Sequence, residues 1–144
     1  MIEQKVPKLN RYFEEQIAMC NQRSKKLLDD ERTDEAAFEK VKANVYDIFR
    51  TILSVAVKTS KGDPDAVRRF FVQKTEQIPS SWVTAYDKAK QHNDTVKMRL
   101  EQIKLDTIGE IKENFAKTWE GADRQRLRRF DFLSACLISP DCRF

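Results

Sequence analysis

The densest cluster of cationic side chains lies near the C-terminus and comprises Arg124, Arg126, Arg128 and Arg129. Guanidinium groups hold phosphates and carboxylates through paired hydrogen bonds, and the adjacent Phe130 or Phe132 could stack on a nucleic-acid base. The same run also fits the solvent-exposed face of an amphipathic helix, because Asp123 and Asp131 dilute its charge. We retain it as a candidate anion-binding site and favour the exposed-helix interpretation. Salt-dependent retention on heparin or DNA would support nucleic-acid binding.

Metal-ligating and nucleophilic side chains are few: one histidine, His92, and three cysteines, Cys20, Cys136 and Cys142. A di-iron site in a helical bundle needs two Glu-x-x-His pairs, and a zinc site needs paired ligands at short spacing. A Ser-His or Cys-His catalytic pair needs a histidine as base. The spacing fits none of these sites. We therefore predict no metal, no cofactor and no catalytic residue, and we expect His92 to be a hydrogen-bonded boundary residue.

Other residue patterns that could support catalysis are equally sparse. The three glycines are isolated, so they form no phosphate-binding loop. Adjacent carboxylates such as Glu14-Glu15 and Asp29-Asp30 read as solvated charge. An enzyme built from scattered carboxylates with Arg68, Arg69 or Arg99 is the least favoured of three functional hypotheses.

The charge balance and the apolar content indicate a folded protein of the cytoplasm. The chain of 144 residues carries 27 basic and 23 acidic side chains, and no segment is strongly basic. Hydrophobic residues make up 40% of the chain, which is enough for a core. We find no apolar signal segment at the start and no window that resembles a membrane span. We therefore expect cytoplasmic localisation, no membrane association and reduced thiols.

Hydrophobic periodicity and the scarcity of glycine predict an all-α fold, a single-domain bundle of four to five helices over residues 1–144. The expected helices span residues 7–30, 34–61, 64–77, 81–119 and 123–137. Pro7 and Pro64 suit a first helical turn, and Asp63 can cap the third helix. Gly62 ends the second helix, Pro79 the third and Gly121 the fourth. Within the fourth helix, residues 92–95 and Gly109 favour a bend.

The widths of the apolar faces predict how the helices are arranged. The helix over 7–30 has one narrow stripe, so it should lie on the outside. The helix over 34–61 is apolar over roughly 200° of its circumference and should be central. Its expected stripe has a heptad spacing and consists of Phe38, Val41, Val45, Ile48, Ile52 and Val55. Such a wide face needs cover from the C-terminal helix or from a second copy of the chain.

In the expected helix over 81–119, the apolar face is also wider in the second half than in the first half. We therefore expect the C-terminal segment, residues 120–144, to pack on it or on a second subunit. The candidate interface consists of Leu105, Ile108, Phe115, Trp119, Leu127 and Phe130. Trp82 and Trp119 should each pack an end of the bundle, although an exposed tryptophan would suit a partner interface.

The leading functional hypothesis is a non-enzymatic helical bundle that acts through protein–protein contact or self-association, as a homodimer. The alternative is a nucleic-acid-associated or regulatory protein that uses the Arg-rich C-terminal helix.

Overall fold

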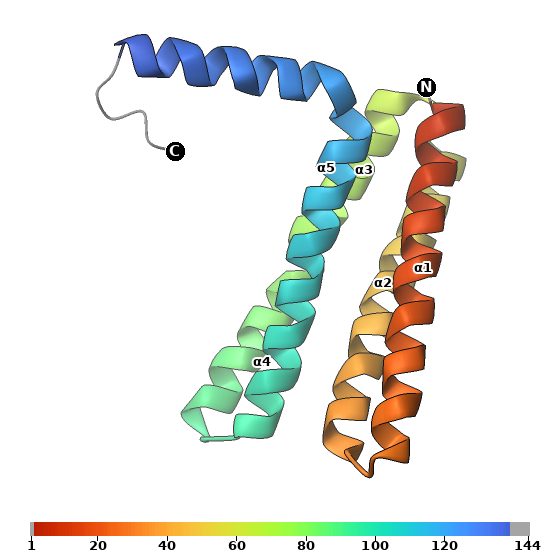
Figure 1. The fold of residues 1–144 in the computed structure, drawn as a ribbon, viewed down its shortest axis with the longest axis vertical. Coiled ribbons are helices and arrows are strands. Elements are labelled where there is room, and N and C mark those ends of the chain that lie inside the picture. Colours follow the sequence, from red (N-terminus) through yellow and green to blue (C-terminus); the bar gives the residue numbers. More distant parts are fainter. Residues whose placement is uncertain (1, 139–144) are drawn as a thin grey trace.

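The computed structural model describes the backbone of residues 2–138 and the side chains of residues 2–120. This part of the chain is helical throughout and contains no strand, which confirms the predicted all-α bundle. The helices are α1 (Ile2–Asp29), α2 (Thr33–Thr59), α3 (Pro64–Gln77), α4 (Pro79–Gln91) and α5 (Thr95–Ile138). Figure 1 shows α1 and α2 side by side as one antiparallel hairpin, with α4 and the first half of α5 forming a second.

The boundaries of α3 follow from residues that the sequence makes conspicuous. The carboxylate of Asp63 accepts a hydrogen bond from the backbone N–H of Asp65 (3.3 Å), which caps the helix as predicted. Gly62 has φ +84°, a left-handed conformation that glycine adopts without steric cost and that ends the preceding turn. Ile78 separates α3 from α4, whose first residue is Pro79, and the predicted range of 64–77 for α3 is confirmed.

The predicted start of the first helix at Pro7 is wrong, because α1 begins at Ile2 and contains Pro7 in its interior. Proline lacks the N–H that would bond the carbonyl four residues earlier, so this helix forgoes one hydrogen bond close to its end. Ile2 and Val6 pack against the core. Burial of these two side chains offsets the lost hydrogen bond and extends the helix.

The predicted helix over 81–119 is also wrong, because the chain reverses within it and forms two antiparallel helices, α4 and α5. Asn93 adopts φ +54° at the reversal, a conformation that asparagine tolerates better than most residues. Asp94 then caps α5 by accepting a hydrogen bond from the Lys97 N–H (3.1 Å). The weak helix formers at 92–94 therefore end the helix instead of bending it.

The cap at Asp94 leads to a first prediction. Asp94→Ala is expected to lower the free energy of unfolding by about 1 kcal/mol, because the Lys97 N–H loses its acceptor. Chemical denaturation followed by circular dichroism measures the loss. Asp87→Ala, which removes an exposed aspartate from the body of α4, is the control and should change stability by less than about 0.5 kcal/mol.

The expected break at Gly121 is not present, since α5 continues through this residue to Ile138. The predicted separate helix over 123–137 is therefore the last part of α5, which Figure 1 shows turning away from the other helices. A single glycine in a helix interior costs only about 1 kcal/mol relative to alanine, which is too little to end a long helix by itself. Packing of residues 120–144 on a second subunit stays a hypothesis.

Helix α2 occupies the centre of the bundle, as predicted, and packs against α1, α3 and α5. Its fully buried side chains are Ala36, Ala43, Val45, Tyr46, Phe49, Leu53 and Ala56. The predicted heptad stripe had the wrong phase, because Ile48 and Val55 remain 39% and 41% exposed. Helix α1 has the expected narrow buried stripe, formed by Leu9, Phe13, Cys20 and Ser24. Within the residues that the structure describes, no helix meets the length and apolarity needed to span a membrane.

Candidate functional site

A column of aromatic rings joins α2, α3 and the second half of α5. The ring of Phe71 meets Phe49 edge to face (5.9 Å between centroids) and stacks on Phe115 (4.2 Å). Phe115 in turn stacks on Trp119 (5.2 Å), and the ammonium group of Lys5 lies over the indole. The broad apolar face of α5 is therefore covered by α3 and by the start of α1.

This packing changes the interpretation of the candidate interface on α5. Ile108, Phe115 and Trp119 are only 5%, 3% and 5% exposed, so helices of the same chain already bury them. Leu105 is half-buried. The side chains of Leu127 and Phe130 lie outside the described residues, as do those of Arg124, Arg126, Arg128 and Arg129.

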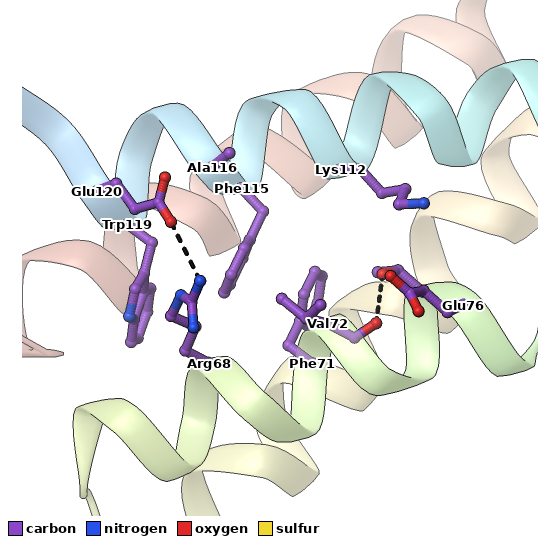
Figure 2. A pocket seen from close by; sticks show the side chains of 10 residues that line it. Arg68, Phe71, Val72, Glu76, Lys112, Phe115, Ala116, Trp119 and Glu120 are labelled. Atoms are coloured by element: carbon purple, nitrogen blue, oxygen red, sulfur yellow. Dashed lines mark hydrogen bonds and ion pairs between the residues drawn. The ribbon is translucent and has the colours of Figure 1, made fainter. Parts of the chain in front are cut away.

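A groove of about 350 Å³ runs between α3 and α5 beside the aromatic column. Figure 2 shows Phe71, Phe115 and Trp119 along its floor, with an ion pair between Arg68 and Glu120 at one end (3.3 Å). Lys112 and Glu76 line the other end of the groove. Two cations and two carboxylates leave the rim close to neutral, so the groove suits an apolar group better than a charged one.

Among the described residues that line the groove, no side chains are arranged to activate a nucleophile. Its one hydroxyl, on Thr75, donates its proton to the Val72 carbonyl oxygen (2.6 Å). Neither histidine nor cysteine is among its lining residues. Over the described part of the chain, no three His, Cys, Asp or Glu side chains lie close enough to hold a metal ion.

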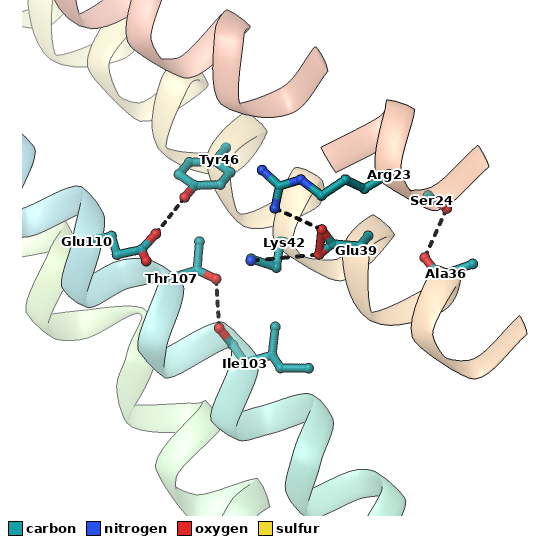
Figure 3. Close-up of polar contacts among 9 residues, drawn as sticks. All are labelled: Arg23, Ser24, Ala36, Glu39, Lys42, Tyr46, Ile103, Thr107 and Glu110. Carbon is teal, nitrogen blue, oxygen red and sulfur yellow. Dashed lines mark hydrogen bonds and ion pairs between the residues drawn. The ribbon is translucent and has the colours of Figure 1, made fainter. Parts of the chain in front are cut away.

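Polar contacts connect the α1–α2 hairpin internally and tie α2 to α5 (Figure 3). The Tyr46 hydroxyl donates to a carboxylate oxygen of Glu110 on α5 (2.9 Å). The Ser24 hydroxyl donates to the Ala36 carbonyl (2.9 Å) and fastens the hairpin beside the loop that joins α1 to α2. These hydrogen bonds join neighbouring helices, so we assign the groups a role in stabilising the fold.

Tyr46 should make stability depend on pH in alkaline solution. Burial raises the pKa of its phenol well above the ordinary value of about 10, and the hydrogen bond to Glu110 raises it further. The unfolded chain releases this proton at a lower pH than the folded chain. The contribution of Tyr46 to stability is therefore complete below about pH 10 and is lost as the pH rises beyond it.

We accordingly expect the free energy of unfolding to fall above about pH 10, and Tyr46→Phe to flatten that fall. At neutral pH the same change should cost about 1 kcal/mol through the lost hydrogen bond. Denaturant titrations between pH 7 and 11 measure both effects. Tyr86→Phe on α4 removes a hydroxyl that makes no hydrogen bond within the described residues and serves as control; an equal response in both variants would contradict the assignment to Tyr46.

The sequence-predicted histidine and cysteine lie apart from one another. His92 is exposed just beyond the end of α4, where its backbone N–H bonds the carbonyls of Lys88 and Ala89 (3.2 Å each). Cys20 is fully buried under α2, and burial raises the pKa of its thiol. Cys136 and Cys142 lie outside the described side chains. The histidine and the buried thiol therefore do not form a shared site.

The outward face of α2 carries a surface that we call the α2 seam. It consists of Ala37, Val41, Asn44, Ile48, Thr51 and Val55, spaced alternately by four and three residues. Val41 is half-buried and the other five residues are exposed. None of the six is charged, although 35% of the chain is. The 4-3 spacing is the pattern by which one helix receives another in a coiled coil.

Comparisons with protein families, characterised proteins and solved structures found no match to this chain.

Proposed function

We propose that this chain is a non-enzymatic helical bundle that acts through protein–protein contact, and that it associates with a second copy through the α2 seam. The observation that carries the proposal is the exposure of Ile48 and Val55 on the central helix of the bundle. Both belong to an uncharged line with heptad spacing, whereas exposed faces of helices in a protein this rich in charge normally carry lysine and glutamate.

The size of the seam indicates how strong such contact should be. From Ala37 to Val55 the seam covers about 27 Å of helix at 1.5 Å per residue. A single pair of helices of this length buries an area near the lower limit for specific interfaces. We therefore expect a reversible dimer with a dissociation constant on the order of micromolar.

The absence of an enzymatic role is a proposal that the chemistry of the groove supports. Its floor is aromatic, its rim charges nearly cancel, and the Thr75 hydroxyl is engaged with the backbone. A partner's apolar side chain fits these properties better than a reacting substrate does, because general acid–base catalysis requires a positioned acid or base beside the reacting atoms.

Sedimentation velocity over roughly 1–200 µM of the full chain tests self-association. We expect the mass to rise from one chain to two across this range, with the α-helical circular dichroism unchanged. A mass of one chain at every concentration would overturn the proposal. A mass that keeps growing beyond two would contradict a single self-complementary surface.

A further inference from the structure

We infer that two copies pack their α2 helices in antiparallel orientation, about a two-fold axis next to Asn44, with Lys40 of each copy paired to Asp47 of the other. This inference rests on the proposed self-association and adds its orientation and register. Two observations support it: the position of the Asn44 amide within the seam, and the opposite charges of Lys40 and Asp47 along one edge of the seam.

Asn44 is the only side chain of the α2 seam with an amide, and it lies between Val41 and Ile48. A single asparagine among apolar seam residues fixes the register of a helix pair, because its amide is best satisfied by the same amide of the partner. With Asn44 at the axis of an antiparallel pair, Ile48 of one copy lies on Val41 of the other. In the same register Thr51 lies opposite Ala37, two small uncharged side chains, and Val55 lies opposite Thr33, just beyond the seam.

The charges distinguish antiparallel from parallel pairing. Lys40 and Asp47 are seven residues apart, exposed, and on the same edge of the seam. In an antiparallel two-fold pair the same edges face each other with the residue order reversed. Lys40 lies four residues before Asn44 and Asp47 lies three residues after it. A two-fold axis at Asn44 therefore brings Lys40 of each copy close to Asp47 of the other and forms two symmetric ion pairs. In a parallel pair this edge would face the edge around Val45 and Ile52, which carries no charge at that level.

Both charged groups can reach the partner from their present positions. The Lys40 ammonium donates to the side-chain oxygen of Asn21 (3.1 Å), and Asp47 pairs with Arg50 of the next turn (2.6 Å). Both contacts lie at the surface and hold the charges beside the seam. A carboxylate accepts several hydrogen bonds at once, so Asp47 can keep Arg50 while it receives Lys40 of the second copy.

Charge reversal tests the inference through heterodimers. Lys40→Glu leaves only carboxylates on this edge, and Asp47→Lys leaves only ammonium groups. We expect each variant alone to associate about tenfold more weakly than the natural chain, because two like-charge contacts replace two ion pairs. An equimolar mixture of the two should regain the natural affinity to within about threefold. Lys88→Glu on α4, away from the seam, should leave association unchanged.

Cysteine cross-linking tests the orientation independently, in a background with Cys136→Ser and Cys142→Ser. In the antiparallel pair Asn44→Cys should form an intermolecular disulfide readily, because the two sulfurs meet at the axis. Thr51→Cys should not, because the two positions would be separated by roughly 20 Å along the helices. Cross-linking of both variants would indicate a parallel pair and overturn the inference.

The outcomes separate the two proposals. If the natural chain dimerises but the mixture of charge variants stays as weak as either alone, the antiparallel register is wrong and self-association stands. If the natural chain does not associate at all, the proposed function fails and the inference fails with it.

Discussion

Phe71→Ala is expected to lower the free energy of unfolding by about 3–5 kcal/mol, a large part of the stability of a domain this size. Phe71 is fully buried, meets Phe49 edge to face and stacks on Phe115. Its removal opens a cavity where α2, α3 and α5 meet, and the stacked column loses its central ring. Urea unfolding monitored at 222 nm measures the loss, and near-ultraviolet circular dichroism reports on the packing of the aromatic side chains.

The adjacent residue provides a matched control for this prediction. Phe70 is only half-buried at the edge of the core, and the ammonium group of Lys74 lies over its ring. Phe70→Ala should therefore cost about 1–2 kcal/mol, because less apolar area returns to water and no closed cavity forms. Equal losses for the two variants would contradict the packing of α3 against α5 through Phe71.

Ile48→Glu is expected to weaken self-association by at least about 100-fold. Each dimer contains two copies of Ile48, and each copy loses the burial of an isoleucine side chain and places a carboxylate in an uncharged contact. Loss of only about 1.4 kcal/mol per copy accounts for the 100-fold change. Sedimentation velocity at concentrations where the natural chain is dimeric should show a single chain.

The control for Ile48→Glu is the same change at an exposed valine outside the seam. Val83 on α4 is 46% exposed, close to the 39% of Ile48. Val83→Glu should leave the mass and its concentration dependence unchanged. Both variants should retain the thermal stability of the natural monomer, because each replaces a side chain that the folded chain leaves in water. Equal weakening by the two variants would show that net charge, and not the seam, controls association.

Local sequence signals predicted the bounds of α3 correctly but failed to predict the reversal of the chain within residues 81–119. The difference follows from the kinds of residue at the two places. Asp63 and Pro64 act through a side-chain cap and a preset φ, and Pro79 lacks the backbone N–H that would continue the hydrogen bonds of α3. These effects do not depend on distant packing. Residues 92–94 are only weak helix formers, and the choice between a bend and a reversal depends on what the following segment can bury. Packing of α4 on the first half of α5 decides it, and Asn93 and Asp94 supply the turn and the cap.

The phase of α2 could not be derived from periodicity alone. A helix that is apolar over more than half of its circumference offers several stripes of nearly equal quality. The structure buries the stripe that contains Tyr46, Phe49 and Leu53, since aromatic rings of α1 and α3 pack there, and leaves Ile48 and Val55 in water. The excess apolar width predicted that a second partner was needed, but not which edge of the helix it would cover.

The α2 seam has a sequence signal that apolar periodicity alone does not reveal. Asn44 and Thr51 are polar, so they are absent from an apolar stripe, yet they complete an uncharged line with the spacing of a coiled coil. In a chain with 35% charged residues, six uncharged positions at this spacing are the signal that marks the seam. The broad apolar face of α5 predicted an interface with the C-terminal segment or a second copy. In the structure α3 of the same chain covers Phe115 instead.

The most direct test of the account is a dilution series of amide nitrogen–proton NMR spectra of the full chain between roughly 10 and 500 µM. The account predicts chemical shifts that change with concentration mainly at residues 37–55, centred on Asn44, and no such change in the Ile48→Glu variant. Shifts that change instead at the α3–α5 groove, or spectra that do not change with concentration at all, would contradict it.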